Sequence, residues 1–186
     1  FKQKTAYEIS TRDWSSDVCS SDLSWYDPGK EADAAKVLIG QGADILTQHT
    51  DSTAPLQVAQ EKGILGFGQS SDMKKFAPKA QITAITDDWD GYYVDQVKQV
   101  LAGTWKSTDT WDGMAKGMVV LPPIENVPAD VKAMAEKTIA GIKDGSIKPF
   151  GGKITKQDGT VPDAVDDGAI LGMNWYVKGI DDKLPG

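Results

Sequence analysis

The sequence predicts an α/β fold in which a largely parallel sheet is flanked by helices. Short apolar segments with the composition of buried strands alternate with longer segments whose apolar residues recur at helical spacing. Glycines stand where the helix-like segments end. The resulting order of strand, helix, strand, helix, strand, strand, helix requires crossover connections, and such connections are typical of parallel sheets.

The first helix is expected to begin at Pro28, because Asp27 is a favourable N-cap and proline suits the first helical turn. Its buried face would consist of Ala32, Ala35, Leu38 and Ile39. Gly40 and Gly42 would end it. Residues 43–47 then have the composition of a short buried strand.

A second helix, capped by Asp51 or Ser52, is expected to end at Gly63, with Leu56, Val58 and Ala59 on its apolar face. Residues 64–67 and 81–85 follow as strands. A third helix ending at Gly103 is indicated by apolar residues at i, i+4, i+7 and i+8, which are Tyr93, Val97, Val100 and Leu101.

The pattern changes beyond Gly103. Residues 104–117 hold Trp105 and Trp111 in a polar loop, as expected where a chain crosses between two lobes, and both rings are expected to pack lobes together. A strand at 118–121 and a helix that starts at Pro128 and ends at Gly145 follow. The apolar face of that helix is Val131, Met134, Ala135, Ile139 and Ile142. Turn signals at 150–152 and 157–159 enclose a short ribbon at 153–156.

Residues 1–23 share no pattern with the rest of the chain. Back-translated, residues 19–23 fit the end of a common sequencing-library adapter, and residues 1–9 resemble the other end of the same adapter. The segment also lacks the apolar stretch of roughly 7 to 15 residues that a signal peptide needs. We therefore expect residues 1–23 to be an adapter-derived artefact outside the folded protein, with the genuine N-terminus missing.

Composition limits the possible partners. The net charge is −7 and no basic stripe is present, which argues against nucleic acid and against an anionic membrane surface. With Cys19 set aside, no cysteine remains for a disulfide or a thiolate metal site. No apolar run approaches the roughly 20 residues needed to span a bilayer. The sequence therefore predicts no cofactor and no metal site.

Aromatic and acidic residues stand just after successive predicted strands, the first of which is a truncated strand that ends before Trp25. Ligands of open parallel sheets bind outside the carboxyl ends of the strands. Indole and phenol rings can stack on a planar ligand, and carboxylates accept hydrogen bonds from its N–H groups. The candidate ligand-binding residues are Trp25, Tyr26, His49, Asp51, Asp72 and Trp89.

Each candidate also has an ordinary structural explanation. Trp25 and Tyr26 suit packing at a hinge, and Asp27 is most simply an N-cap. His49 is the only histidine, so it cannot build a multi-histidine metal site. Asp51 suits capping as well as binding. Asp72 follows Gly68, whose missing side chain permits close backbone approach.

From Trp25 onward the chain resembles the basic membrane protein family, the substrate-binding proteins of ABC importers that include purine nucleoside receptors. The resemblance covers all of the plausible protein sequence. It is carried by residues 25–31, 48–52, 66–69, 71–73, 76–80, 103–105, 149–150, 157–159 and 173–176.

The resemblance implies a type I periplasmic-binding-protein-like fold, of which this chain is a truncated part: the second lobe plus return segments of the first. Residues 24–103 would form the α/β ligand-binding lobe, and residues 104–186 would cross the hinge and complete the lobes. The protein would be a monomer, periplasmic or lipid-anchored at the outer face of the cytoplasmic membrane. It would deliver a purine or purine nucleoside to an ABC permease.

Some residues depart from the family pattern. Gln69 and Ser70 stand where a second acidic group often occurs, and Thr86-Asp87 replaces an expected lysine. Because those groups would serve the ribose, a free base such as adenine or guanine is favoured. Asp90 replaces a glycine expected after Trp89, which affects the local geometry.

Two rival functions stay open. A receptor of the same fold for a sugar or another amphipathic ligand would also use aromatic residues with carboxylates. An enzyme on a doubly wound sheet could use the same carboxylates and the histidine for acid–base chemistry. The chain has neither a Gly-x-Gly-x-x-Gly turn nor a P-loop, so nucleotide-cofactor chemistry lacks its phosphate site. We therefore expect a binding protein and not an enzyme.

Overall fold

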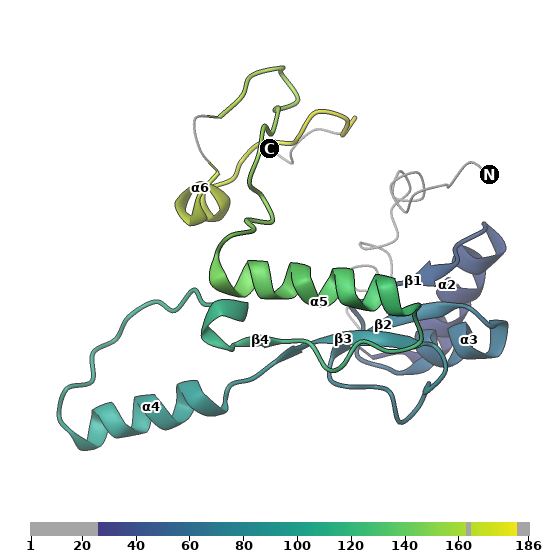
Figure 1. The fold of residues 1–186 in the computed structure, drawn as a ribbon, viewed down its shortest axis with the longest axis horizontal. Coiled ribbons are helices and arrows are strands. Elements are labelled where there is room, and N and C mark those ends of the chain that lie inside the picture. Colours follow the sequence, from purple (N-terminus) through teal and green to yellow (C-terminus); the bar gives the residue numbers. More distant parts are fainter. Residues whose placement is uncertain (1–25, 163–164, 182–186) are drawn as a thin grey trace. The chain divides into compact units, whose positions relative to one another are not determined.

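The computed structural model describes residues 26–162 and 165–181, which form two compact units, one up to Glu136 and one from Lys137. The predicted adapter-derived segment and Trp25 lie outside the described residues. The elements, all but η2 labelled in Figure 1, are α2 (Pro28–Gly40), β1 (Ile45–Leu46), α3 (Ala54–Lys62), β2 (Leu65–Ser70), β3 (Gln81–Asp87), α4 (Asp90–Leu101), the 3₁₀-helix η2 (Met114–Lys116), β4 (Val119–Val120), α5 (Ala129–Asp144) and α6 (Asp167–Leu171).

The sheet has the strand order β1-β2-β3-β4. β1 pairs in parallel with β2, and β2 with β3, whereas β4 pairs antiparallel with β3 through Thr86 and Val120. The predicted parallel-dominated α/β fold is therefore confirmed. β2 runs to Ser70 and β3 to Asp87, so both are longer than expected, while β1 is shorter than the predicted 43–47.

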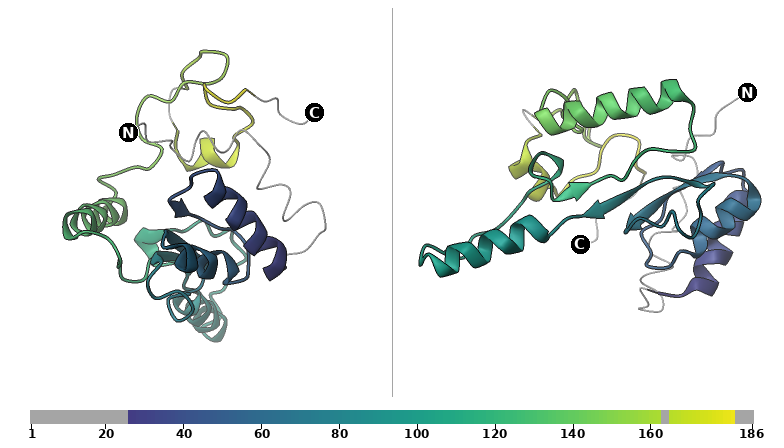
Figure 2. Two further views of the ribbon diagram at one scale, coloured as in Figure 1. Left: turned by 90° about the vertical axis from the view of Figure 1, so that its right-hand side faces the viewer. Right: turned by 60° about the horizontal axis from the view of Figure 1, so that its bottom comes forward.

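The core of the first unit lies between α2, α3 and the first two strands. Its buried members are Ala35, Leu46, Leu56, Val58, Ala59, Met73, Ala77 and Ala80. The other predicted face residues of α2, Ala32, Leu38 and Ile39, pack partly buried against it. α2 and α3 contact each other, as Figure 2 shows. The helical periodicity therefore predicted the buried face of α2 correctly.

Neither Asp51 nor Ser52, the two residues expected to cap α3, is its N-cap. Its N-cap is Thr53, which makes no side-chain capping bond, and the Ser52 hydroxyl accepts a hydrogen bond from Ala54 N at 3.2 Å. The helix ends as predicted at Gly63, which has a left-handed φ of 71° that favours glycine. The local pattern identified the right segment but not the capping residue.

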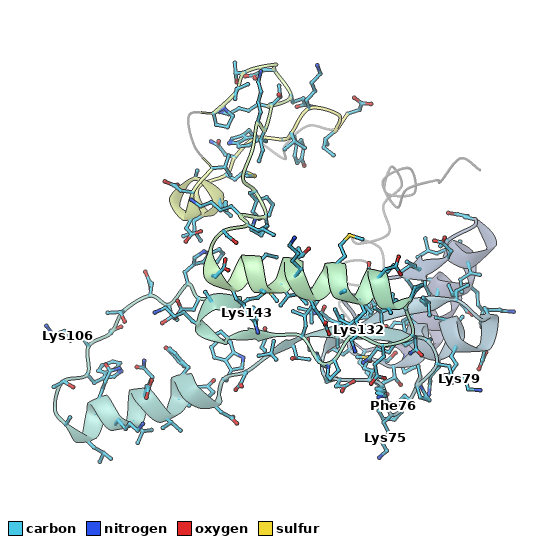
Figure 3. The ribbon with its side chains drawn as sticks, in the orientation of Figure 1. Lys75, Phe76, Lys79, Lys106, Lys132 and Lys143 are labelled. Atoms are coloured by element: carbon cyan, nitrogen blue, oxygen red, sulfur yellow. The ribbon has the colours of Figure 1, made fainter. Side chains whose placement is uncertain are left out.

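The loop between β2 and β3 is held by several bonds. Backbone N–H groups of Phe76 and Ala77 donate to Met73 O at 2.9 and 3.3 Å, and Lys74 pairs with Glu125 at 2.5 Å. Lys75, Phe76 and Lys79 project from this loop (Figure 3). The loop therefore has a fixed backbone, although it contains no helix or strand.

α4 forms where the periodicity predicted a helix, but none of its residues is buried. Its apolar face, Tyr93, Val97, Val100 and Leu101, is 58 to 82% exposed. The predicted helix is confirmed. Its apolar face is not buried by any of the described residues. Periodicity reveals an apolar face but not the surface that covers it.

The second unit begins within α5, which ends as predicted before Gly145 with its φ of 78°. The expected ribbon at 153–156 forms no strand; Lys156 instead makes a single antiparallel bridge with Val177. The predicted turn at 157–159 is present, with Gly159 at a φ of 87°. The Thr160 hydroxyl and amide donate to Asp158 Oδ1 and lower the pKa of that carboxyl below its ordinary value.

Candidate functional site

The parallel strands β1, β2 and β3 end at one edge of the sheet, and the predicted ligand-binding residues follow those ends along the chain. The carboxyl ends of β1, β2 and β3 are Leu46, Ser70 and Asp87. The segments that follow them carry His49 and Asp51, then Asp72, then Trp89. Because neighbouring parallel strands end at the same edge, this edge is the candidate site.

The segment before α2 is fixed by the first turn of that helix. Asp27 is the N-cap, as predicted, and its Oδ1 accepts a hydrogen bond from Lys30 N at 3.0 Å. Asp27 N in turn donates to Glu31 Oε1 at 3.0 Å. The Tyr26 side chain next to this cap is 63% exposed.

The loop after β1 folds around a buried amide. Gln48 Nε2 donates to Thr50 O at 3.2 Å, to Ser52 O at 2.8 Å and to Met73 Sδ at 3.8 Å. Gln48 and Ser52 are buried, whereas His49 and Asp51 between them are exposed. The two predicted site residues therefore face solvent on a loop whose backbone is held from the inside.

Asp72 is held by two donors to one of its oxygens. Its Oδ1 accepts from Gln81 Nε2 at 2.6 Å and from Lys74 N at 3.0 Å. Both bonds go to Oδ1, and the residue is exposed, so Oδ2 can accept a hydrogen bond from a ligand. Within the described chain, Gln81 Oε1 and Thr50 Oγ1 are buried without a hydrogen-bond partner.

Trp89 belongs to a group of three aromatic rings at the start of α4. Its ring centroid lies 5.8 Å from that of Tyr92 and 5.9 Å from that of Tyr93. The Trp89 side chain remains 45% exposed. Hydrogen bonds through buried side chains connect the segments that carry Asp27, His49 and Asp72. The Trp89 side chain instead lies against the two tyrosine rings of α4.

Sequence reasoning missed the buried polar residues that hold the site, Glu31, Gln48 and Gln81. All three are at most 9% exposed. One signal was present: Glu31 lies at helical spacing from Ala35 and Leu38, on the face predicted to be buried. A carboxylate on such a face must find hydrogen-bond donors, because burying an unpaired charge is costly.

The described part of the chain offers no group of three His, Cys, Asp or Glu side chains that could hold a metal ion. Within the same part, no helix is both long and apolar enough to cross a membrane. The residues at the edge of the sheet can instead stack on a ring and form hydrogen bonds with its polar groups.

Known proteins with similar sequences identify the family. The family described as ABC transporter substrate-binding protein PnrA-like matches residues 17–157. The chain belongs to this family. A purine-binding protein of Brucella abortus is 58% identical over 166 residues, which are 87% of this chain and 47% of the relative. The predicted membership of the basic membrane protein family is therefore confirmed.

More distant proteins share the fold. A putative ABC transporter glucose-binding protein of Haloferax volcanii is 24% identical over 87% of this chain and 40% of its own length. A solute-binding protein of Conexibacter woesei superposes with a TM-score of 0.53 at 25% identity, over 66% of this chain and 42% of that one. A transcriptional activator from Bacillus halodurans gives a TM-score of 0.60 at 18% identity, over 69% and 46%. The chain spans about half the length of the curated relatives it matches.

Gly68→Ala should destabilise the site. A Cβ at Gly68 would lie 2.9 Å from Ala84 Cβ and 3.1 Å from Ser71 O, and both neighbours are held by the sheet or its loop. We expect a loss of about 1 to 3 kcal/mol in the free energy of unfolding, measured by urea denaturation. Gly91→Ala is the control, because its Cβ meets nothing within 4 Å and alanine favours a helix. Equal stabilities of the two variants would contradict the prediction.

Proposed function

We propose that this chain is part of the substrate-binding component of an ABC importer and that the protein binds a purine base or purine nucleoside between two lobes. Family membership and the purine-binding relative support this function. The structural observation that carries it is that Tyr26, His49, Asp51 and Asp72 are exposed on segments held by buried polar side chains.

A free base, adenine or guanine, fits the site better than a nucleoside. The family pattern leads us to expect a lysine for the ribose at the position of Thr86-Asp87. The Thr86 hydroxyl instead donates to Val120 O at 2.8 Å. Gln69 Nε2 lies 3.4 Å from Ser70 Oγ, so these two residues form a hydrogen bond with each other. Gln69, Ser70 and Thr86 are uncharged, and Asp87 carries a negative charge where a positive lysine is expected.

The remaining parts of the proposal follow from the family. Residues 24–103 would supply a ligand-binding lobe, and residues 104–186 would cross the hinge and complete the lobes. The protein would act outside the cytoplasm, in the periplasm or lipid-anchored, as a monomer without enzymatic activity, and would pass its ligand to a membrane permease. Residues Trp25 and Trp89 would add ring contacts to those of Tyr26.

Calorimetric titration tests the function. It uses the full-length protein, by which we mean the complete product of the source gene, of which this chain is proposed to be a part. Adenine, guanine, adenosine and guanosine are titrated in parallel with glucose and ribose. We expect a Kd of about 1 μM or tighter for at least one purine compound. Binding of a sugar alone would favour the rival receptor, which the Haloferax relative and the pairing of aromatic rings with carboxylates also support.

Asp72→Ala in the full-length protein should weaken purine binding by about tenfold or more, because a hydrogen bond to a charged group contributes roughly 1.5 to 3 kcal/mol. Asp72→Asn keeps an oxygen for Gln81 Nε2 and Lys74 N but removes the charge, so it should retain the loop and lose affinity. Asp33→Ala is the control, since Asp33 is exposed and pairs only with Lys36 on α2. Unchanged Kd values for both Asp72 variants would exclude Asp72 from the ligand site.

A further inference from the structure

Glu31 is a buried carboxylate that the proposed binding of ligand does not use directly. It is 2% exposed and lies in the first turn of α2. An ionised carboxylate is tolerated at such a position only if hydrogen bonds replace the lost water. Glu31 meets this requirement with donors from two distant segments of the chain.

The two oxygens of Glu31 face different segments. Oε1 accepts from Asp27 N at 3.0 Å, in the segment that carries Tyr26. Oε2 accepts from Ser52 N at 3.3 Å and also, in a short hydrogen bond, from Ser52 Oγ. Ser52 lies 21 positions away, in the loop that carries His49 and Asp51. One carboxylate therefore joins two segments of the candidate site.

The connection continues from Ser52 to the third segment. Ser52 O accepts from Gln48 Nε2 at 2.8 Å, and the same amide donates to Met73 Sδ at 3.8 Å. Met73 directly follows Asp72. A path of hydrogen bonds thus runs from the segment before α2 through Glu31, Ser52 and Gln48, and it reaches the segment after β2 through the N–H···S contact with Met73.

We propose that Glu31 and Ser52 are positioning residues, which fix the segments of Tyr26 and His49 relative to each other before the ligand arrives. This inference rests on the proposed function. Binding is tighter when the binding groups are already ordered, because the ligand then does not have to immobilise their side chains. Neither residue needs to touch the ligand.

Two variants of the full-length protein test the proposal. Ser52→Ala removes the hydroxyl but leaves the backbone donor. Glu31→Gln replaces one carboxylate oxygen with an NH₂ group, which cannot accept, so the hydrogen bond from Asp27 N or the one from Ser52 N must be lost. At 25 °C, with folding verified by circular dichroism, we expect each variant to bind adenine or guanine about tenfold more weakly than the unchanged protein.

Matched variants separate positioning from general destabilisation. Thr53→Ala changes the next residue, whose side chain makes no capping bond, and should leave the Kd unchanged. Ser52→Thr keeps the hydroxyl and should restore most of the affinity. The proposal is overturned if Ser52→Ala and Glu31→Gln keep the original Kd whatever their Tm, or if Thr53→Ala weakens binding equally.

Hydrogen exchange provides a readout that needs no ligand. Ser52→Ala should accelerate amide exchange in residues 48–53 and also in residues 26–31, because both segments share Glu31. Unchanged exchange in residues 26–31 would overturn the positioning role. If the unchanged protein binds none of adenine, guanine, adenosine and guanosine, the proposed function fails, whereas the exchange result still decides whether the segments are coupled.

Discussion

Residues 24–186 alone should bind purines at least about a hundredfold more weakly than the full-length protein, and binding should be weak or undetectable by calorimetry. Small-molecule sites bury roughly 70 to 90% of the ligand surface. In the proposed two-lobed site, the described residues would supply one side of the ligand pocket, and the chain spans less than half the length of its Brucella relative. The opposite side of the ligand would stay in water.

The comparison requires that both proteins are folded. Circular dichroism and a cooperative urea transition should be recorded for the shorter protein, whose α4 carries an apolar face with no cover among the described residues. The full-length protein is the positive control in the same buffer. A Kd of about 1 μM or tighter for residues 24–186 would show that one lobe is sufficient and would refute the two-lobed site.

Leu56→Ala should cost about 3 kcal/mol in the free energy of unfolding, which is a large fraction of the stability of an ordinary domain. Leu56 is 1% exposed in the core between α3 and the strands. Its Cδ2 would lie only 2.7 Å from a Cβ placed on Gly66, so the side chain packs directly on the backbone of β2. Removing it leaves a cavity that this backbone cannot readily fill.

Urea denaturation of the full-length protein measures this loss. Val37→Ala is the comparison, because Val37 is 58% exposed on α2 and its truncation should change stability by no more than about 0.5 kcal/mol. Similar losses for the two variants would mean that Leu56 is not a core residue. Purine affinity of the folded fraction should be unchanged in both, since neither residue lies in the candidate site.

Local chemistry explains which parts of the fold could be predicted. Asp27 and Pro28 define a helix start through their own side chains, and Gly63 defines a helix end through its φ, so neither signal depends on distant residues. Strand lengths were predicted less well. β1 is short and β2 long because pairing with a neighbouring strand, rather than composition, sets where a strand ends.

The candidate site was predicted only in its outer part. The rule that ligands bind beyond the carboxyl ends of parallel strands singled out His49, Asp51 and Asp72 from sequence order alone. Gln81 was not singled out, because its bond to Asp72 joins the first residue of β3 to the loop that follows β2. Such a contact depends on the register between β2 and β3, which the sequence does not state.

The sequence by itself determined the fold class, the family and the segments that carry the aromatic and acidic groups, because these follow from periodicity, turn residues and shared motifs. Only the tertiary structure decided that Glu31 joins the segments of Asp27 and Ser52 and that Gln48 holds the loop around His49. The physical reason is that buried polar groups must find partners wherever the folded chain supplies them. Those partners are close in space but distant in sequence.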